Sequence, residues 1–71
     1  MSRALVDAAI VGLASGEDLT LCAALVTADE AADFARGARA FGVCYTCVLL
    51  CLFLIEAREG ADLDAIRATL N

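Results

Sequence analysis

Apolar residues recur along this chain at the three- and four-residue spacing of amphipathic α-helices. A first helix is expected over residues 2–14, where Asp7 is the only charge in the interior. Gly16 interrupts the pattern, and glycine is the residue that most often follows the end of a helix. A short second helix is expected over about 17–26, opened by two acidic residues.

The next helix has the clearest start signal in the sequence. Thr27 and Glu30 match the capping box, in which each side chain binds a backbone N–H of the other residue. No proline interrupts the residues that follow, so we predict one long helix over about 28–58. Gly37 and Gly42 lie inside it, and each costs about 1 kcal/mol relative to alanine. A kink or a break near Gly42 is the alternative.

A short final helix is expected over residues 62–70. Leu63, Ile66 and Leu70 would form its apolar stripe, because they recur at the spacing of one helix face. No linker or repeat divides the sequence. We therefore predict an all-α fold, a small helical bundle of three to four helices around the long apolar central one, as a single domain over residues 1–71.

The middle of the predicted long helix is apolar on every side. Residues 40–55 carry no charge, and 62% of the 71 residues are hydrophobic, with a mean hydropathy of +0.80. Ordinary domains contain about 45–50% apolar residues, and a chain this short buries only about 60% of its unfolded surface. We therefore expect another chain to cover apolar surface, so that oligomerisation completes the bundle.

A row of small residues marks one side of the predicted long helix. Their spacing alternates between three and four residues, as at the contact positions of a coiled coil. The row consists of Gly37, Ala40, Cys44, Cys47 and Cys51. Small residues let two helices approach closely, so we predict that two copies of the chain form a homodimer along this row. The alternative is that the row packs on the first or second helix of the same chain.

The four cysteines are candidate ligands for a metal. Four thiolates can hold zinc or an iron–sulfur cluster. Cys22, Cys44, Cys47 and Cys51 follow the order C-x21-C-x2-C-x3-C. This order resembles, in spacing alone, that of the WhiB-like regulators, and the resemblance would imply a [4Fe–4S] cluster. The chain departs from that family in its shorter last gap, in having no tryptophan and in lacking the basic C-terminal tail.

Cysteines that pack in a core like small hydrophobic residues are the commoner case, and we favour this interpretation. A zinc or iron–sulfur regulator is one alternative, and a disulfide-bonded protein is the other. Cys44 and Cys47 would be poorly placed to bond to each other if both lay on one face of a helix. We therefore predict no cofactor and no metal.

Charge and composition argue against several classes of function. Five basic residues against ten acidic ones give a net charge of −5, whereas binding of DNA or RNA needs clustered cations. Histidine is absent, and no serine stands in an obvious nucleophile setting, so we predict that the protein is not an enzyme. The acidic pairs at 17–18 and 29–30 lie at expected helix starts, where the helix dipole explains them.

A membrane-inserted protein with one short hydrophobic helix is a further alternative. As a helix, residues 40–55 would measure roughly 24 Å, which is shorter than the roughly 30 Å hydrocarbon core of a bilayer. Asp7 disfavours a secretion signal at the N-terminus. We expect a cytoplasmic protein, with the inner membrane as the alternative. The absence of lysine fits a genome of high GC content, such as that of an actinobacterium or one of its phages.

Together, these patterns predict a small non-enzymatic interaction module whose partners are a second copy of itself and another protein. Acidic residues are expected on two exposed faces, where they serve solubility or a partner. These residues are Asp29, Glu30 and Asp33 on one face and Glu56, Glu59 and Asp62 on the other.

Overall fold

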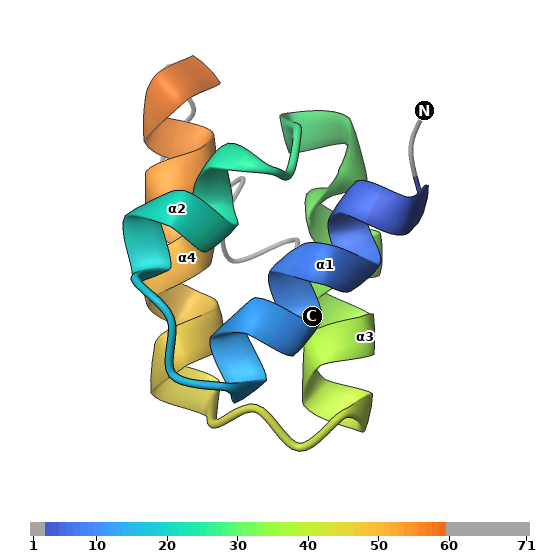
Figure 1. The fold of residues 1–71 in the computed structure, drawn as a ribbon. Helices are drawn as coiled ribbons and strands as arrows, with labels where there is room; N and C mark the ends of the chain where they lie inside the picture. The colour runs from blue at the N-terminus through green and yellow to red at the C-terminus, as the bar shows by residue number, and fades with distance from the viewer. Residues whose placement is uncertain (1–2, 60–71) are drawn as a thin grey trace.

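The computed structural model of this protein describes residues 3–59. In this part the chain forms four α-helices and one short 3-10 helix (Figure 1). Their bounds are α1 Arg3–Ala14, α2 Leu19–Ala24, η1 Ala28–Glu30, α3 Ala31–Ala40 and α4 Tyr45–Glu59. The prediction of a small all-α fold is confirmed. The final helix expected over 62–70 lies outside the described residues.

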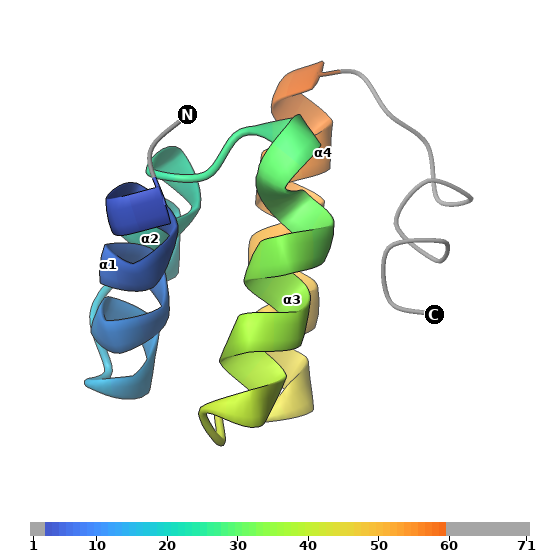
Figure 2. The same ribbon diagram turned by 90° about the vertical axis from the view of Figure 1, so that its right-hand side faces the viewer.

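The helices form two antiparallel hairpins that pack face to face. α1 and α2 make one hairpin, and α3 and α4 make the other (Figures 1 and 2). Between the hairpins, α1 packs on α3 and α2 packs on α4. Each described helix thus has two principal neighbours, and none of them lies at the centre of the others. The expected central helix is therefore replaced by a four-cornered arrangement.

Gly42 ends α3 and separates it from α4, with a φ of +94° that residues with a side chain adopt only at a cost. The Gly42 N–H donates to the Arg39 carbonyl over 3.1 Å. The Val43 N–H donates to the Ala38 carbonyl over 3.0 Å, which completes a Schellman motif and satisfies the last carbonyls of the helix. The single helix predicted over 28–58 is therefore wrong, and the alternative of a break near Gly42 is confirmed.

The hairpin of α1 and α2 turns in the same way. Gly16 has a φ of +84°. The Glu17 N–H donates to the Gly12 carbonyl over 3.0 Å, the same long-range bond of a Schellman motif. Asp18 then caps α2, because its Oδ1 accepts a hydrogen bond from the Thr20 N–H over 2.7 Å.

The helical segment that contains η1 and α3 begins at the predicted capping box. The Thr27 N–H donates to Oε1 of Glu30 over 3.0 Å, and the Thr27 hydroxyl donates to the same oxygen over 3.1 Å. The first turn is a 3-10 helix, which is common at helix termini. The predicted start of this segment is confirmed.

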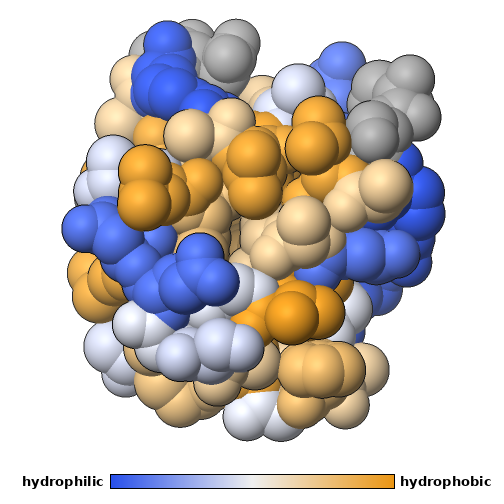
Figure 3. Space-filling view, in the orientation of Figure 1, coloured by the Kyte–Doolittle hydropathy of each residue, from blue (hydrophilic) through white to orange (hydrophobic). Residues whose placement is uncertain are grey.

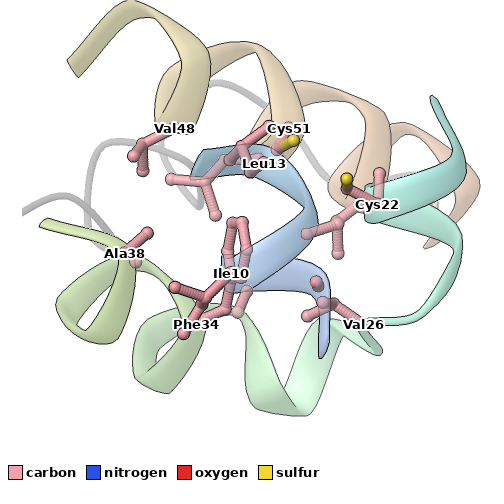
Figure 4. Packing of buried hydrophobic residues seen from close by; sticks show 14 of the residues in the cluster. Ile10, Leu13, Cys22, Val26, Phe34, Ala38, Val48 and Cys51 are labelled. Carbon is pink, nitrogen blue, oxygen red and sulfur yellow. The ribbon is translucent and has the colours of Figure 1, made fainter. Parts of the chain in front are cut away.

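The core lies between the two hairpins. Figure 4 shows that side chains from all four helices point into one interior, with Phe34 of α3 among them. The core residues are Val6, Ala9, Ile10, Leu13, Cys22, Ala23, Val26, Ala31, Phe34, Ala35, Ala38, Val48, Cys51, Leu52 and Ile55. α1 and α3 approach closely at Gly37, where an added Cβ would lie 2.7 Å from Cδ1 of Ile10.

Arg58 joins the last turn of α4 to the end of α2. Its Nη1 donates to the Ala23 carbonyl over 3.1 Å, and its Nη2 donates to the Val26 carbonyl. Carbonyls at a helix C-terminus lack partners within the helix and carry the negative end of its dipole. The guanidinium therefore satisfies the end of a neighbouring helix, in addition to lying in the last turn of its own.

α4 contains most of the uncharged stretch noted in the sequence, but it is only 15 residues long. Val48, Leu52 and Ile55 on its inner side are fully buried against the other helices. Among residues 3–59, no helix combines the length and the apolar character needed to cross a membrane.

We predict that Gly42→Ala lowers the free energy of unfolding by about 1–2 kcal/mol, because alanine is disfavoured at positive φ. No atom lies within 4 Å of the position of an added Cβ, so the loss would report backbone strain alone. Gly42→Asn is the matched control and should lose less, since asparagine tolerates this region. Urea denaturation followed by circular dichroism measures both. A more stable Gly42→Ala variant would show that α3 and α4 continue as one helix, because alanine favours a helix interior.

We also predict that Arg58→Ala lowers the free energy of unfolding by about 1–2 kcal/mol, because two carbonyls of the neighbouring hairpin lose a charged donor. Arg36→Ala is the control. Arg36 pairs with Asp33 on the exposed surface of α3, and such pairs contribute about 0–1 kcal/mol. The same urea experiment compares the two variants, and equal losses would contradict the role assigned to Arg58.

Candidate functional site

Cys44 and Cys47 bring two thiols together at the start of α4. Cys44 directly precedes the helix, and its carbonyl accepts the first helical hydrogen bond, from the Val48 N–H over 3.2 Å. Cys47 lies in the first turn. The two Sγ atoms are 3.1 Å apart and share a hydrogen bond. These two residues are termed the dithiol pair below.

The two thiols of the dithiol pair differ in environment. Cys44 is exposed and Cys47 is half-buried. The Cys47 N–H donates to Sγ of Cys44 over 3.4 Å, so that the Cys44 sulfur caps the helix. The Cys47 thiol, and after it the Cys47 N–H, lower the pKa of Cys44, because both bonds stabilise its thiolate. The bond to Cys44 and then burial raise the pKa of Cys47, so Cys44 is the thiol that ionises more readily.

The other two cysteines lie in the core. Cys22 of α2 and Cys51 of α4 are both buried, and Figure 4 shows them on facing helices. Burial raises the pKa of the Cys51 thiol to about 11, and the thiols of Cys22 and Cys47 add to the rise. Burial also raises the pKa of Cys22, followed by the charges of Glu17 and Asp18. Both thiols pack as core residues, in agreement with the favoured interpretation of the sequence.

The row of small residues predicted as a pairing surface is divided by the turn. Gly37 and Ala40 lie on α3, Cys44 lies in the connection, and Cys47 and Cys51 lie on α4. Gly37 faces α1 and Cys51 is fully buried, so contacts within the chain occupy both positions. The expectation of one continuous row on one helix is therefore wrong. Pairing through the surface members, Ala40, Cys44 and Cys47, stays a prediction.

The structure separates the four cysteines that were considered as ligands. The dithiol pair lies at the start of α4, whereas Cys22 and Cys51 lie in the core. Over residues 3–59, no group of three or more histidine, cysteine or acidic side chains is placed to hold a metal ion. The four-cysteine cluster considered from the spacing alone thus has no counterpart in the described part of the chain.

The structure also corrects the expectation that the dithiol pair is poorly placed to form a bond. That expectation assumed that both residues lie within one helix. Because the helix begins at Tyr45, the Cys44 side chain is free of the helical arrangement and reaches toward Cys47. The sequence does contain a signal for this geometry, a C-x-x-C segment that starts two residues after a glycine able to end a helix.

Two of the acidic residues expected on exposed faces are buried. Glu30 is taken up by the capping box, and Glu56 is 6% exposed on the inner side of α4. The aspartates of η1 and α3 are exposed. The Glu59 side chain and Asp62 lie outside the described residues. The described part therefore offers a smaller acidic surface than the sequence predicts.

The side of α4 that faces away from the bundle carries no charge. This surface, termed the outer face, spans three helical turns. It consists of Thr46, Leu50, Phe53, Leu54 and Ala57, all of them exposed. Its three large side chains keep 44%, 39% and 37% of their surface exposed, in that order along the chain.

Other exposed apolar side chains in the described part are shorter in extent or lie among charges. On α1, Val11 shares its side of the helix with the ion pair of Arg3 and Asp7, whose Nε and Oδ1 are 3.6 Å apart. On α2, Leu21 and Leu25 are one turn apart on a helix of six residues. Figure 3 shows this face, over α1 and α2, where hydrophilic side chains interrupt the apolar ones. Of the described helices, α4 alone presents three uncharged turns.

The dithiol pair and the outer face of α4 are thus the two surface features with a chemical or binding capacity of their own. In comparisons with protein-family models, curated proteins and solved structures, nothing matched this chain. The function is therefore inferred from these two features and from the side chains around them.

We predict that an alkylating reagent modifies the native protein at Cys44 first and Cys47 second. Cys22 and Cys51 should react at least about tenfold more slowly, because only the thiolate reacts and burial disfavours it. Iodoacetamide labelling followed by mass spectrometry measures the order. In urea all four should react alike, which serves as the control. Labelling of Cys51 at the rate of Cys44 in the native protein would contradict the assigned burial.

Proposed function

We propose that this protein is a small non-enzymatic interaction module that self-associates through the outer face of α4. One observation carries the proposal. Leu50, Phe53 and Leu54 stay exposed on consecutive turns of a helix whose opposite side is fully buried in the core. Apolar side chains gathered on one surface mark a site of association, because covering them removes apolar area from water.

The absence of charge on the outer face determines which occupant fits it. A second copy brings an identical uncharged surface, so no unpaired charge is buried when the two meet. A symmetric contact of this kind is self-complementary, which is the usual arrangement of homodimers. The hydrophobic content of 62% in a chain of 71 residues supports the same occupant, since a single small core cannot take up that many apolar side chains.

Net charge opposes this association at long range. Each copy carries a formal charge of −5, so two copies repel each other in dilute buffer. Salt screens that repulsion within about 10 Å at 0.1 M ionic strength, whereas it does not weaken an apolar contact. Self-association through the outer face should therefore strengthen as salt is added.

We place this module in the cytoplasm. The described cysteines are free, and Cys44 is exposed to solvent. Exposed free thiols persist in a reducing compartment, whereas oxidising compartments convert suitably placed pairs to disulfides.

We predict that sedimentation equilibrium finds a dimer of the full-length protein, and that Leu50→Glu raises its dissociation constant at least tenfold. The reason is that a charge placed at the centre of an apolar contact has no partner, and about 1.4 kcal/mol corresponds to a factor of ten. Because Leu50 is 44% exposed, the fold should survive, which circular dichroism verifies. Raising the salt concentration should lower the dissociation constant of the unaltered chain.

Leu21→Glu is the matched control for this measurement. Leu21 is a more exposed leucine, at 64%, on the opposite hairpin, and the same substitution there should leave the dissociation constant unchanged. A full-length protein that remains monomeric at millimolar concentration would refute self-association. A Leu21→Glu variant that dissociates as readily as Leu50→Glu would show that the contact lies elsewhere.

A further inference from the structure

We propose that Cys44 and Cys47 form a redox-active dithiol, which closes to an intramolecular disulfide by exchange with an exposed disulfide such as oxidised glutathione. This inference goes beyond self-association and does not depend on it. The observation that carries it is the approach of two sulfur atoms to 3.1 Å at the surface.

The pair needs only a small movement to form a bond. A disulfide joins its sulfur atoms at about 2.05 Å, so the two Sγ atoms have to approach by about 1 Å. Cys44 lies in the connection before α4 and is exposed, so its side chain has room to rotate. The bonded core side chains of α4, such as Val48 and Leu52, lie beyond the pair and keep their contacts.

Accessibility separates this pair from the other two cysteines. An incoming disulfide has to reach a sulfur atom in line with the bond that breaks, and Cys44 offers such access because it is exposed. Cys22 and Cys51 are 2% and 0% exposed, so solution disulfides reach them only after the core opens. The chain therefore contains a reactive pair and an internal unreactive reference.

The hydrogen bonds of the pair assign the two roles. The Cys47 N–H and the Cys47 thiol both stabilise negative charge on Sγ of Cys44, which makes Cys44 the attacking thiol. Cys47 is half-buried and adjacent, so it is placed to attack Cys44 in turn and acts as the resolving thiol.

The exchange consists of two steps that balance. In the first, the Cys44 thiolate attacks one sulfur of an incoming disulfide RSSR. A bond forms between Cys44 and that sulfur, the original S–S bond breaks, and RS⁻ leaves and takes up a proton. In the second, Cys47 gives its proton to water and its thiolate attacks Sγ of Cys44, which releases the second RS⁻. The protein loses two hydrogen atoms in total, and RSSR is reduced to two thiols.

Capping of α4 alone does not explain the pair. Serine, aspartate and asparagine are the strong N-cap residues, and a thiol is a weak hydrogen-bond acceptor. A capping role also gives no reason for a second thiol at the very position whose sulfur touches the first. Thiol–disulfide exchange accounts for both cysteines and for their spacing.

The test uses the full-length protein in glutathione buffers of increasing oxidised fraction. Free thiols are blocked with N-ethylmaleimide, and intact mass is then measured. Trypsin cuts after Arg39 and Arg58, so one peptide holds Cys44, Cys47 and Cys51, and fragmentation locates the bond. We expect the loss of two hydrogen atoms, a bond between Cys44 and Cys47, and full reversal by reduced glutathione. Protein that stays reduced in oxidised glutathione, or a bond to Cys51, would overturn the proposal.

Two serine variants separate the roles, and both alter side chains at the surface. Cys47→Ser should accumulate a glutathione adduct on Cys44, at least about tenfold above the unaltered protein, because the resolving thiol is missing. Cys44→Ser should form neither the adduct nor the disulfide. Leu50→Glu should oxidise like the unaltered protein, which shows that the bond is within one chain. An adduct that persists on Cys44 when Cys47 is present would refute the resolving role.

Discussion

The turn at Gly42 is the constraint on which the rest of this structure depends. A continuous helix over 28–58 would be about 45 Å long, and its apolar second half would have no neighbours within the chain. Ending α3 at Gly42 returns α4 along the bundle, where Val48, Leu52 and Ile55 complete the core. The backbone conformation at one glycine thus converts an exposed apolar rod into the fourth side of a closed bundle. It also leaves Cys44 outside the helix, where its sulfur meets that of Cys47.

Local signals predicted the elements well, because they act over a few residues. Thr27 and Glu30 place a helix start, and Gly16 places a helix end, by hydrogen bonds that the same residues make in the structure. The break at Gly42 could be proposed but not decided from the sequence. A glycine inside a helix costs about 1 kcal/mol, and the burial of several large side chains of α4 outweighs that term. Those contacts reach α2, which is distant along the sequence.

The candidate site was harder to predict than the fold, for the same reason. With Cys44 assigned to a helix, all three late cysteines fell on one side and looked equivalent. The structure gives them three environments: Cys44 is exposed, Cys47 is half-buried and Cys51 is fully buried. The outer face of α4 was hidden in a stretch that is apolar on every side, since only packing reveals which side stays uncovered. What the sequence does establish is the excess of apolar residues, which makes an uncovered side expected.

The dithiol pair and the outer face meet at Thr46, the first residue of the outer face, which lies between the two cysteines. A disulfide there would close a loop of only four residues. In the chain-entropy model, such a loop limits the unfolded chain by about 2 kcal/mol, which is too little to remodel a core that Phe34 and Ile55 hold together. Closure would therefore act locally, on the cap of α4 and the first turn of the outer face. Any influence of redox state on self-association then has to pass through that single turn, because the rest of the outer face rests on side chains that oxidation does not reach.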